Sequence, residues 1–241
     1  MGLPKIDVPT FDLTFPSNGQ TVKARPFLVK EEKLLLMASE SKDINEVINA
    51  TIQVLNNCVL DEDVNIEKLP FFDIDYLFIA LRAKSVGENI EIRFTCNNIV
   101  DGDTCNNIFP ATLDISNCAI VKDDNVSDDI KVGEGKSVKL KYPTYRQMKL
   151  ITSNDSDADK KIRLIASCIE FIYDKDQIYS AKDHTKEELV EFVEGMTENN
   201  FKKMEAFIDN LPSFAVTAEA TCDKCGFQHK LRYTNFERFF T

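Results

Sequence analysis

The chain has no tryptophan, and it has only two histidines and eight glycines. The last two shortages each argue against a class of site. With only His184 and His229 available, there is little material for histidine-based catalysis or a histidine-rich metal site. The glycines form neither GxxxxGK nor GxGxxG, so neither of these two glycine-rich phosphate-binding loops is present. The patterns GxSxG and HExxH are absent as well. We therefore expect a protein without catalytic turnover, and neither a hydrolase nor a transferase.

Long apolar runs and an excess of positive charge are also missing. No apolar run approaches the roughly 20 residues that a membrane-spanning helix needs. The formal net charge is −11 at pH 7. Such a charge disfavours nucleic acid as a main partner, because phosphate binding needs a basic surface. The 241 residues, 43% hydrophobic and 29% charged, are typical of a soluble globular chain with one large domain or two small ones.

The sequence does contain seven cysteines, and two of them have the spacing of a zinc knuckle. In Cys222-Asp-Lys-Cys225-Gly226 a tight turn aims both sulfurs at one point, and the glycine can take the positive φ that such a turn needs. A knuckle supplies two of the four ligands of a structural zinc site. Cys96 and Cys105, at the tip of another strand-like segment, are the natural partners. The sequence thus predicts one structural zinc bound by four thiolates in a zinc-ribbon arrangement.

The cysteine pattern leaves four alternatives open. The four thiols could be free, they could form disulfides, iron could replace zinc, or His229 could replace one thiolate. Disulfides are disfavoured because the cysteine count is odd and no secretory leader is evident. Zinc is the usual metal of structural tetrathiolate sites. We expect Cys58, Cys118 and Cys168 to be buried as small apolar residues.

The order of expected elements predicts an α+β fold with an internal duplication. Each half reads as a β-hairpin, then helices, then a second hairpin that carries a cysteine pair. We place the halves at residues 1–116 and 117–241. The tetracysteine site would join the two halves, because each half contributes one pair of sulfurs.

Two spacings support the duplication. Lys33 and Lys149 follow similar basic and proline-containing segments, 116 residues apart (149 − 33 = 116). Cys96 and Cys222 are 126 residues apart (222 − 96 = 126). The identity between the halves is low, and the argument depends on the common order of their elements.

Residues 20–38 resemble a signature of the T4-type bacteriophage baseplate hub protein family. The resemblance is carried by Val22-Lys-Ala-Arg-Pro-Phe-Leu-Val-Lys-Glu-Glu-Lys-Leu-Leu-Leu-Met-Ala38. The segments Phe94-Thr-Cys96-Asn-Asn98 and Thr221-Cys-Asp-Lys-Cys-Gly226 are similar to that family too. The resemblance covers most of the chain.

The resemblance implies a component of the tail of a contractile-tailed phage. Its partners would be other baseplate hub and tail proteins in a hetero-oligomeric assembly. It would be located in the virion tail baseplate, or in the host cytoplasm during assembly. One alternative is a hub assembly chaperone that is absent from the mature virion. Another is a zinc-ribbon regulatory protein, which would need a more basic face than Lys224, Lys230 and Arg232 provide.

Two segments are candidates for partner binding. In residues 30–36 we expect the three leucines to pack inward, which would leave Lys30 and Lys33 outward where a partner can contact them. Aromatic residues dominate interface hot spots. The C-terminal phenylalanines are therefore the second candidate: Phe236, Phe239 and Phe240.

Overall fold

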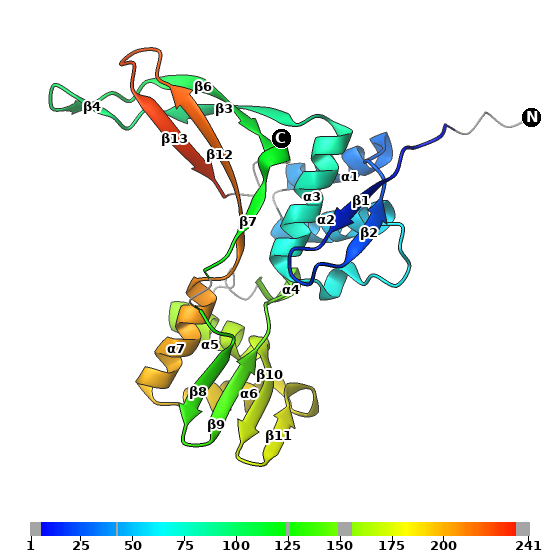
Figure 1. The fold of residues 1–241 in the computed structure, drawn as a ribbon, viewed down its shortest axis with the longest axis vertical. Helices are drawn as coiled ribbons and strands as arrows, with labels where there is room; N and C mark the ends of the chain where they lie inside the picture. The colour runs from blue at the N-terminus through cyan, green and yellow to red at the C-terminus, as the bar shows by residue number, and fades with distance from the viewer. Residues whose placement is uncertain (1–5, 42, 124–125, 149–155, 235–241) are drawn as a thin grey trace, which may run out of the picture. The chain divides into compact units, whose positions relative to one another are not determined.

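The computed structural model describes residues 6–41, 43–123, 126–148 and 156–234 (Figure 1). Helices and antiparallel strands both contribute, so the predicted α+β class is confirmed. The chain divides into two compact units. The first unit comprises Met1–Ile66, Phe72–Val121 and Ser213–Thr241, and the second comprises Glu67–Phe71 and Lys122–Pro212.

The helical part of the first unit packs around one apolar helix. This part contains β1 (Phe11–Thr14), β2 (Thr21–Ala24), α1 (Val29–Ser41), α2 (Ile44–Cys58) and α3 (Phe71–Ser85). Of the short η1 (Ile66–Lys68), only Ile66 belongs to the first unit. Helix α3 carries buried, mostly apolar side chains on nearly every side, and Phe72, Leu77, Phe78 and Leu81 are almost completely buried. A helix that is apolar all round lies inside a core rather than on its surface. Helix α3 is therefore the central helix of this part of the first unit.

The remaining elements of the first unit are paired strands and one short 3-10 helix, η2. They are β3 (Asn89–Thr95), β4 (Ile99–Val100), β5 (Asp103–Thr104), β6 (Ile108–Asp114), η2 (Ile115–Asn117), β7 (Ala119–Val121), β12 (Ser213–Thr221) and β13 (Gln228–Tyr233). Strand β3 pairs with β6, and β12 pairs with both β13 and β7. Strands β12 and β6 also contact each other. Figure 1 shows the β3–β6 hairpin alongside the β12–β13 hairpin. This contact brings residues near 100 and near 225 together.

The second unit is an antiparallel sheet with helices. The sheet order is β11-β10-β9-β8, built from β8 (Asp129–Gly133), β9 (Lys136–Leu140), β10 (Ile169–Asp174) and β11 (Gln177–Ser180). Its helices are α4 (Tyr145–Met148), α5 (Asp157–Cys168), η4 (Ala181–Asp183), α6 (Lys186–Glu194) and α7 (Glu198–Asp209). A capping box is present at the start of α6, where the Thr185 and Glu188 side chains each accept a hydrogen bond from the other residue's backbone N–H.

The compact units do not follow the predicted halves 1–116 and 117–241. Strand β12 pairs through Ser213–Ala215 with β7, so the C-terminal hairpin belongs to the first unit. Backbone pairing and the contact between the two cysteine tips place this hairpin with the first unit, although it lies at the C-terminal end of the sequence. In addition, hairpin β10–β11 lies between α5 and α6, whereas the described part of the first half has no hairpin among its helices. Lys149 lies outside the described residues. The internal duplication stays a prediction.

Candidate metal centre

Each cysteine pair begins where a strand ends. Thr95 is the last residue of β3 and pairs with Ile108 on β6. Thr221 is the last residue of β12 and pairs with Gln228 on β13. Cys96 and Cys222 are therefore the first residues beyond equivalent positions of two hairpins.

The two tips share one hydrogen-bond pattern. In the C-terminal tip the Cys222 N–H donates to the Phe227 carbonyl at 3.0 Å, and the Gly226 N–H donates to the Cys222 carbonyl at 2.9 Å. In the other tip the Cys96 N–H donates to the Asn107 carbonyl at 2.8 Å, and the Asn106 N–H donates to the Cys96 carbonyl at 3.0 Å. The Cys96–Cys105 tip therefore has the backbone of a knuckle, although its Cys-x8-Cys spacing does not suggest one.

Left-handed backbone closes both tips. Gly226 has φ 70° and Asn106 has φ 50°. Glycine reaches this region freely, and asparagine is among the few other residues that occupy it readily. The expected role of Gly226 is confirmed, and Asn106 takes the same role in the other tip.

The longer tip contains a small hairpin that the sequence interpretation missed. Its cysteines are nine positions apart (105 − 96 = 9), whereas those of the shorter tip are three apart (225 − 222 = 3), a difference of six residues. Those six residues are β4, the turn Asp101–Gly102 and β5. Both turn residues have positive φ, 53° and 94°. An Asp-Gly pair directly after β-branched residues, here Ile99 and Val100, is a usual signal for such a turn, and it could have revealed this hairpin.

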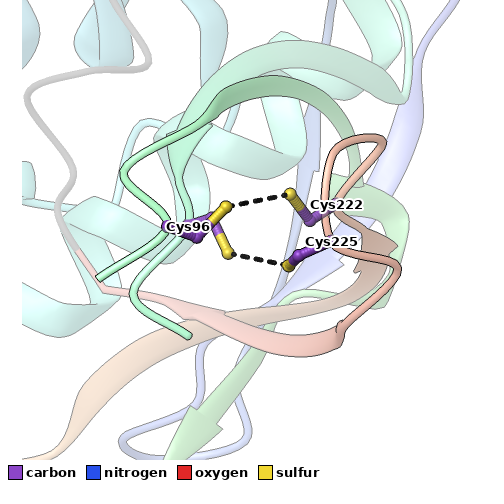
Figure 2. A group of neighbouring side chains, drawn as sticks. Cys96, Cys222 and Cys225 are labelled. Carbon is purple, nitrogen blue, oxygen red and sulfur yellow. Dashed lines mark hydrogen bonds between the residues drawn. The ribbon is translucent and has the colours of Figure 1, made fainter. Parts of the chain in front are cut away.

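The four sulfurs gather as a metal ion would require. The Cys96 and Cys225 sulfurs are 3.6 Å apart, and the Cys105 and Cys222 sulfurs are 4.0 Å apart. All four lie within 4.8 Å of one another. Zinc–sulfur bonds of about 2.3 Å in a tetrahedron place the sulfurs about 3.8 Å apart. Figure 2 shows the sulfurs of Cys222 and Cys225 directed across the site toward Cys96.

The same distances decide against disulfides among these residues. A disulfide bond is about 2.05 Å long, and all seven cysteines are free thiols. Cys96 and Cys222 are buried, while Cys105 and Cys225 are partly exposed. Cys96, Cys222 and Phe109 form a small apolar core, packed against Phe94 and Ala220. A bound metal would be shielded from solvent on this side.

The two buried thiols differ in how readily they ionise. Burial raises the pKa of Cys96 to about 12. Burial also opposes ionisation of Cys222, but the backbone N–H groups of Cys225 and Lys224 and the Asn107 amide outweigh it and lower the Cys222 pKa to about 6. Cys222 is therefore prepared to bind a cation as a thiolate at neutral pH, whereas Cys96 needs the cation itself to favour its thiolate.

Two asparagine side chains donate hydrogen bonds across the site to sulfurs of the opposite hairpin, and one histidine contacts a sulfur of the opposite hairpin. Asn98 donates to the Cys225 sulfur at 3.7 Å, and Asn107 donates to the Cys222 sulfur at 3.6 Å. His229 Nε2 lies 3.2 Å from the Cys96 sulfur. A metal-bound Cys96 is a thiolate and cannot donate, so Nε2 must then carry the proton.

His229 contacts one of the four candidate metal ligands but is not itself one of them. The group of four mutually close ligand atoms consists of the cysteines and does not include the imidazole ring. The ring is 5% exposed and lies against Phe94, Phe109 and Phe227, with centroids 5.6, 5.4 and 4.8 Å away. In register, His229 pairs with Ala220 and Phe109 pairs with Phe94, so His229 and Phe109 hold equivalent positions in the two hairpins.

We expect His229→Phe to bind metal 10- to 100-fold more weakly than the wild type, because loss of a hydrogen bond to a ligand typically costs that much affinity. Phenylalanine already occupies the equivalent position 109, so its shape suits the hairpin. Competition with a chromophoric chelator measures the affinity. His229→Gln, which keeps an N–H donor, should recover part of the loss. His184→Asn, in the second unit, is the control, and equal affinities in all variants would contradict the role of His229.

The sequence was compared with protein families, with curated proteins and with solved structures. A family model described as T4 bacteriophage base plate protein matches residues 8–241. The chain belongs to this family. The baseplate family match covers nearly the whole chain, including both cysteine tips, and confirms the resemblance found in residues 20–38. Searches of the curated proteins and of the solved structures found no match. Within the described residues, the helices are too short or too polar to cross a membrane.

The candidate partner-binding residues of α1 are exposed. Lys33 points to solvent, and Lys30 is 70% exposed with its Nζ 3.6 Å from Glu31. The expectation that all three leucines pack inward is wrong. Leu35 is buried, but Leu36 is 47% exposed, because successive helical residues point about 100° apart. Phe236, Phe239 and Phe240 lie outside the described residues, and their role stays a prediction.

Proposed function

We propose that this baseplate-family chain is a non-enzymatic component of the central hub and acts by docking on other hub and tail proteins. The family match over residues 8–241 is the observation that carries the proposal. We also propose that one zinc ion, bound by Cys96, Cys105, Cys222 and Cys225, holds the two hairpins together. Tetrahedral thiolate coordination suits a structural zinc, and iron is the alternative that a metal analysis would distinguish.

The metal site suits a part that must keep its shape during assembly. Two separate hairpins converge on one set of four sulfurs, so the metal would link residues more than 100 positions apart. A cross-link of this kind preserves the relative position of the hairpins when neighbouring proteins bind. The zinc thus has a structural role in the proposal.

Co-sedimentation tests the proposal. The full chain, tagged and added to baseplate hubs from infected cells, should sediment with the hubs and not with hub-free extract. Mass spectrometry of purified virions then distinguishes a permanent hub component from an assembly chaperone that leaves the particle. A chain that fails to sediment with hubs, and that is also absent from virions, would overturn the hub assignment.

We expect Lys33→Glu to weaken hub binding about 3- to 10-fold while leaving the fold intact. Lys33 is exposed on α1, and reversing a charge at the rim of an interface mainly slows association. Lys30→Gln is the milder companion variant, because a glutamate at position 30 would also face the buried Glu31. Circular dichroism checks the fold, and co-sedimentation at two salt concentrations measures binding. Wild-type binding by both variants would exclude this face of α1 as the contact.

A further inference from the structure

The six residues of β4, its turn and β5 are not needed to close a cysteine knuckle. The Cys222–Cys225 tip makes the same two backbone hydrogen bonds with two residues between its cysteines. The Cys96–Cys105 tip makes them with eight, and residues 99–104 account for the difference. We call residues 99–104 the finger. Because the metal site does not require the finger, its sequence calls for another explanation.

The finger exposes apolar side chains. Ile99 is 69% exposed and Val100 is 41% exposed. Two further apolar residues next to the metal centre are exposed as well, Ile108 at 63% and Phe227 at 45%. Single exposed apolar residues are ordinary, but several at one end of a hairpin pair are typical of an interaction surface. Figure 1 shows β4 at the outer end of the β3–β6 hairpin.

The finger has a defined shape. Ile99 pairs with Thr104, and Val100 pairs with Asp103. At its base the Cys105 N–H donates to the Asn98 carbonyl at 2.8 Å. The base is flanked by two metal-site cysteines, so a bound metal would fix it further. A surface that is ordered before binding loses little conformational entropy on binding.

The charges of the finger indicate what it binds. Asp101 and Asp103 are exposed beside the two apolar residues, and the whole chain carries a net charge of −11. An anionic membrane surface would repel such a tip, and so would a second copy of this acidic chain. A pocket with an apolar floor and a rim of lysine or arginine complements both the apolar side chains and the negative charges of the finger.

We propose that the finger inserts into an apolar, basic-rimmed pocket on another protein of the baseplate. This inference rests on the proposed hub function and names the surface that makes the contact. Ile99 and Val100 bury their side chains in the pocket, and Asp101 and Asp103 pair with its rim. The metal centre holds the finger in its binding orientation.

The test removes the finger from the full-length chain. Deletion of residues 99–104 leaves Cys96-Asn-Asn-Cys105, which has the same spacing as Cys222–Cys225. The probe is baseplate hubs purified from cells infected with phage that lack this chain. We expect the shortened protein to keep its metal and circular dichroism spectrum and to bind hubs at least 10-fold more weakly than the wild type.

Point variants keep the inference testable if the deletion disturbs the knuckle. Ile99→Asn with Val100→Thr should weaken hub binding at least 10-fold. Asp101→Asn with Asp103→Asn should weaken hub binding less than the apolar variant does, and it should reduce the salt dependence of binding. Asparagine is suitable at position 101 because it tolerates the positive φ of that residue. Ile178→Asn, another exposed isoleucine on β11, is the matched control and should bind normally.

The outcomes separate this inference from the proposed function. If the wild type does not bind hubs, the hub function fails first. If the wild type binds and the finger variants bind equally well, the finger inference is overturned while the hub function stands. A third outcome is that the wild type self-associates or binds anionic vesicles, and that the finger variants lose this property but keep hub binding. The finger would then bind a second copy of the chain or a lipid surface, and the inference is likewise overturned.

Discussion

The double variant Cys222→Ser with Cys225→Ser is expected to lose its metal and to melt at a clearly lower temperature. Serine cannot replace thiolate as a zinc ligand at neutral pH, and two ligands do not retain the ion. A metal present at about 1,000 times its dissociation constant contributes about 4 kcal/mol to the free energy of unfolding. The variant should lose stability of that order. Elemental analysis and thermal unfolding, both under reducing conditions, measure the two effects.

Cys118→Ser is the matched control for this experiment. Cys118 is a partly buried thiol of the same unit, outside the group of four sulfurs. Burial raises its pKa to about 11, so it stays protonated at neutral pH. The control should keep one metal per chain. Wild-type protein without zinc or iron, or a double variant as stable as the wild type, would contradict a structural metal.

Removal of the Glu31 carboxylate is expected to have a comparable effect on the first unit. Glu31 is 1% exposed, and it accepts hydrogen bonds from Arg25 Nη2 at 3.0 Å and from the Leu28 N–H at 2.9 Å. The Arg25 side chain is itself only 14% exposed. Glu31→Ala leaves this guanidinium buried without its partner. Breaking a buried ion pair in this way typically costs about 3–5 kcal/mol.

The loss should depend on pH in a defined direction. Burial raises the pKa of Glu31, but the hydrogen bonds from Arg25 and Leu28 and the charges of Arg25 and Lys30 outweigh it, so the pKa is lowered. A carboxylate with a lowered folded pKa stabilises the fold above its unfolded pKa of about 4.3 and ceases to do so as the pH falls through the folded value. Wild type and Glu31→Ala should therefore differ most near neutral pH and converge in acid.

Urea unfolding at several pH values measures this difference. Glu32→Ala, at the neighbouring exposed position, is the control and should change stability by less than about 0.5 kcal/mol. The double variant Arg25→Met with Glu31→Leu should recover much of the loss, because an apolar pair can replace a buried ion pair. A constant difference between wild type and Glu31→Ala from pH 7 to pH 3 would show that packing, and not charge, is responsible.

Local sequence signals determined several features of this protein correctly. The Cys-x2-Cys-Gly spacing specified the Cys222–Cys225 knuckle, because a turn of this kind depends only on adjacent residues. The Thr185–Glu188 capping box was predictable for the same reason. The apolar composition of α3 predicted its central position. Each of these signals lies within one turn or one helix.

Tertiary structure alone decided what depends on distant contacts. The spacing of Cys96 and Cys105 gave no sign of a knuckle, since six inserted residues separate the two halves of its turn. The predicted halves differ from the compact units because β12 pairs with β7 as well as with β13. Which distant strands pair with each other depends on the register of the whole sheet, and no local sequence pattern specifies that register.

The surroundings of single polar residues were also decided by the fold. Alternation along β13 predicts that His229 faces inward, but only the packing of the two hairpins places its ring 3.2 Å from the Cys96 sulfur. Glu31 lies in a mixed-charge stretch that reads as solvent-exposed, yet Arg25 and the start of α1 enclose it. The sequence determines which groups can ionise or bind a metal. Burial and partners from distant segments determine which of them do, because both arise only when the chain has folded.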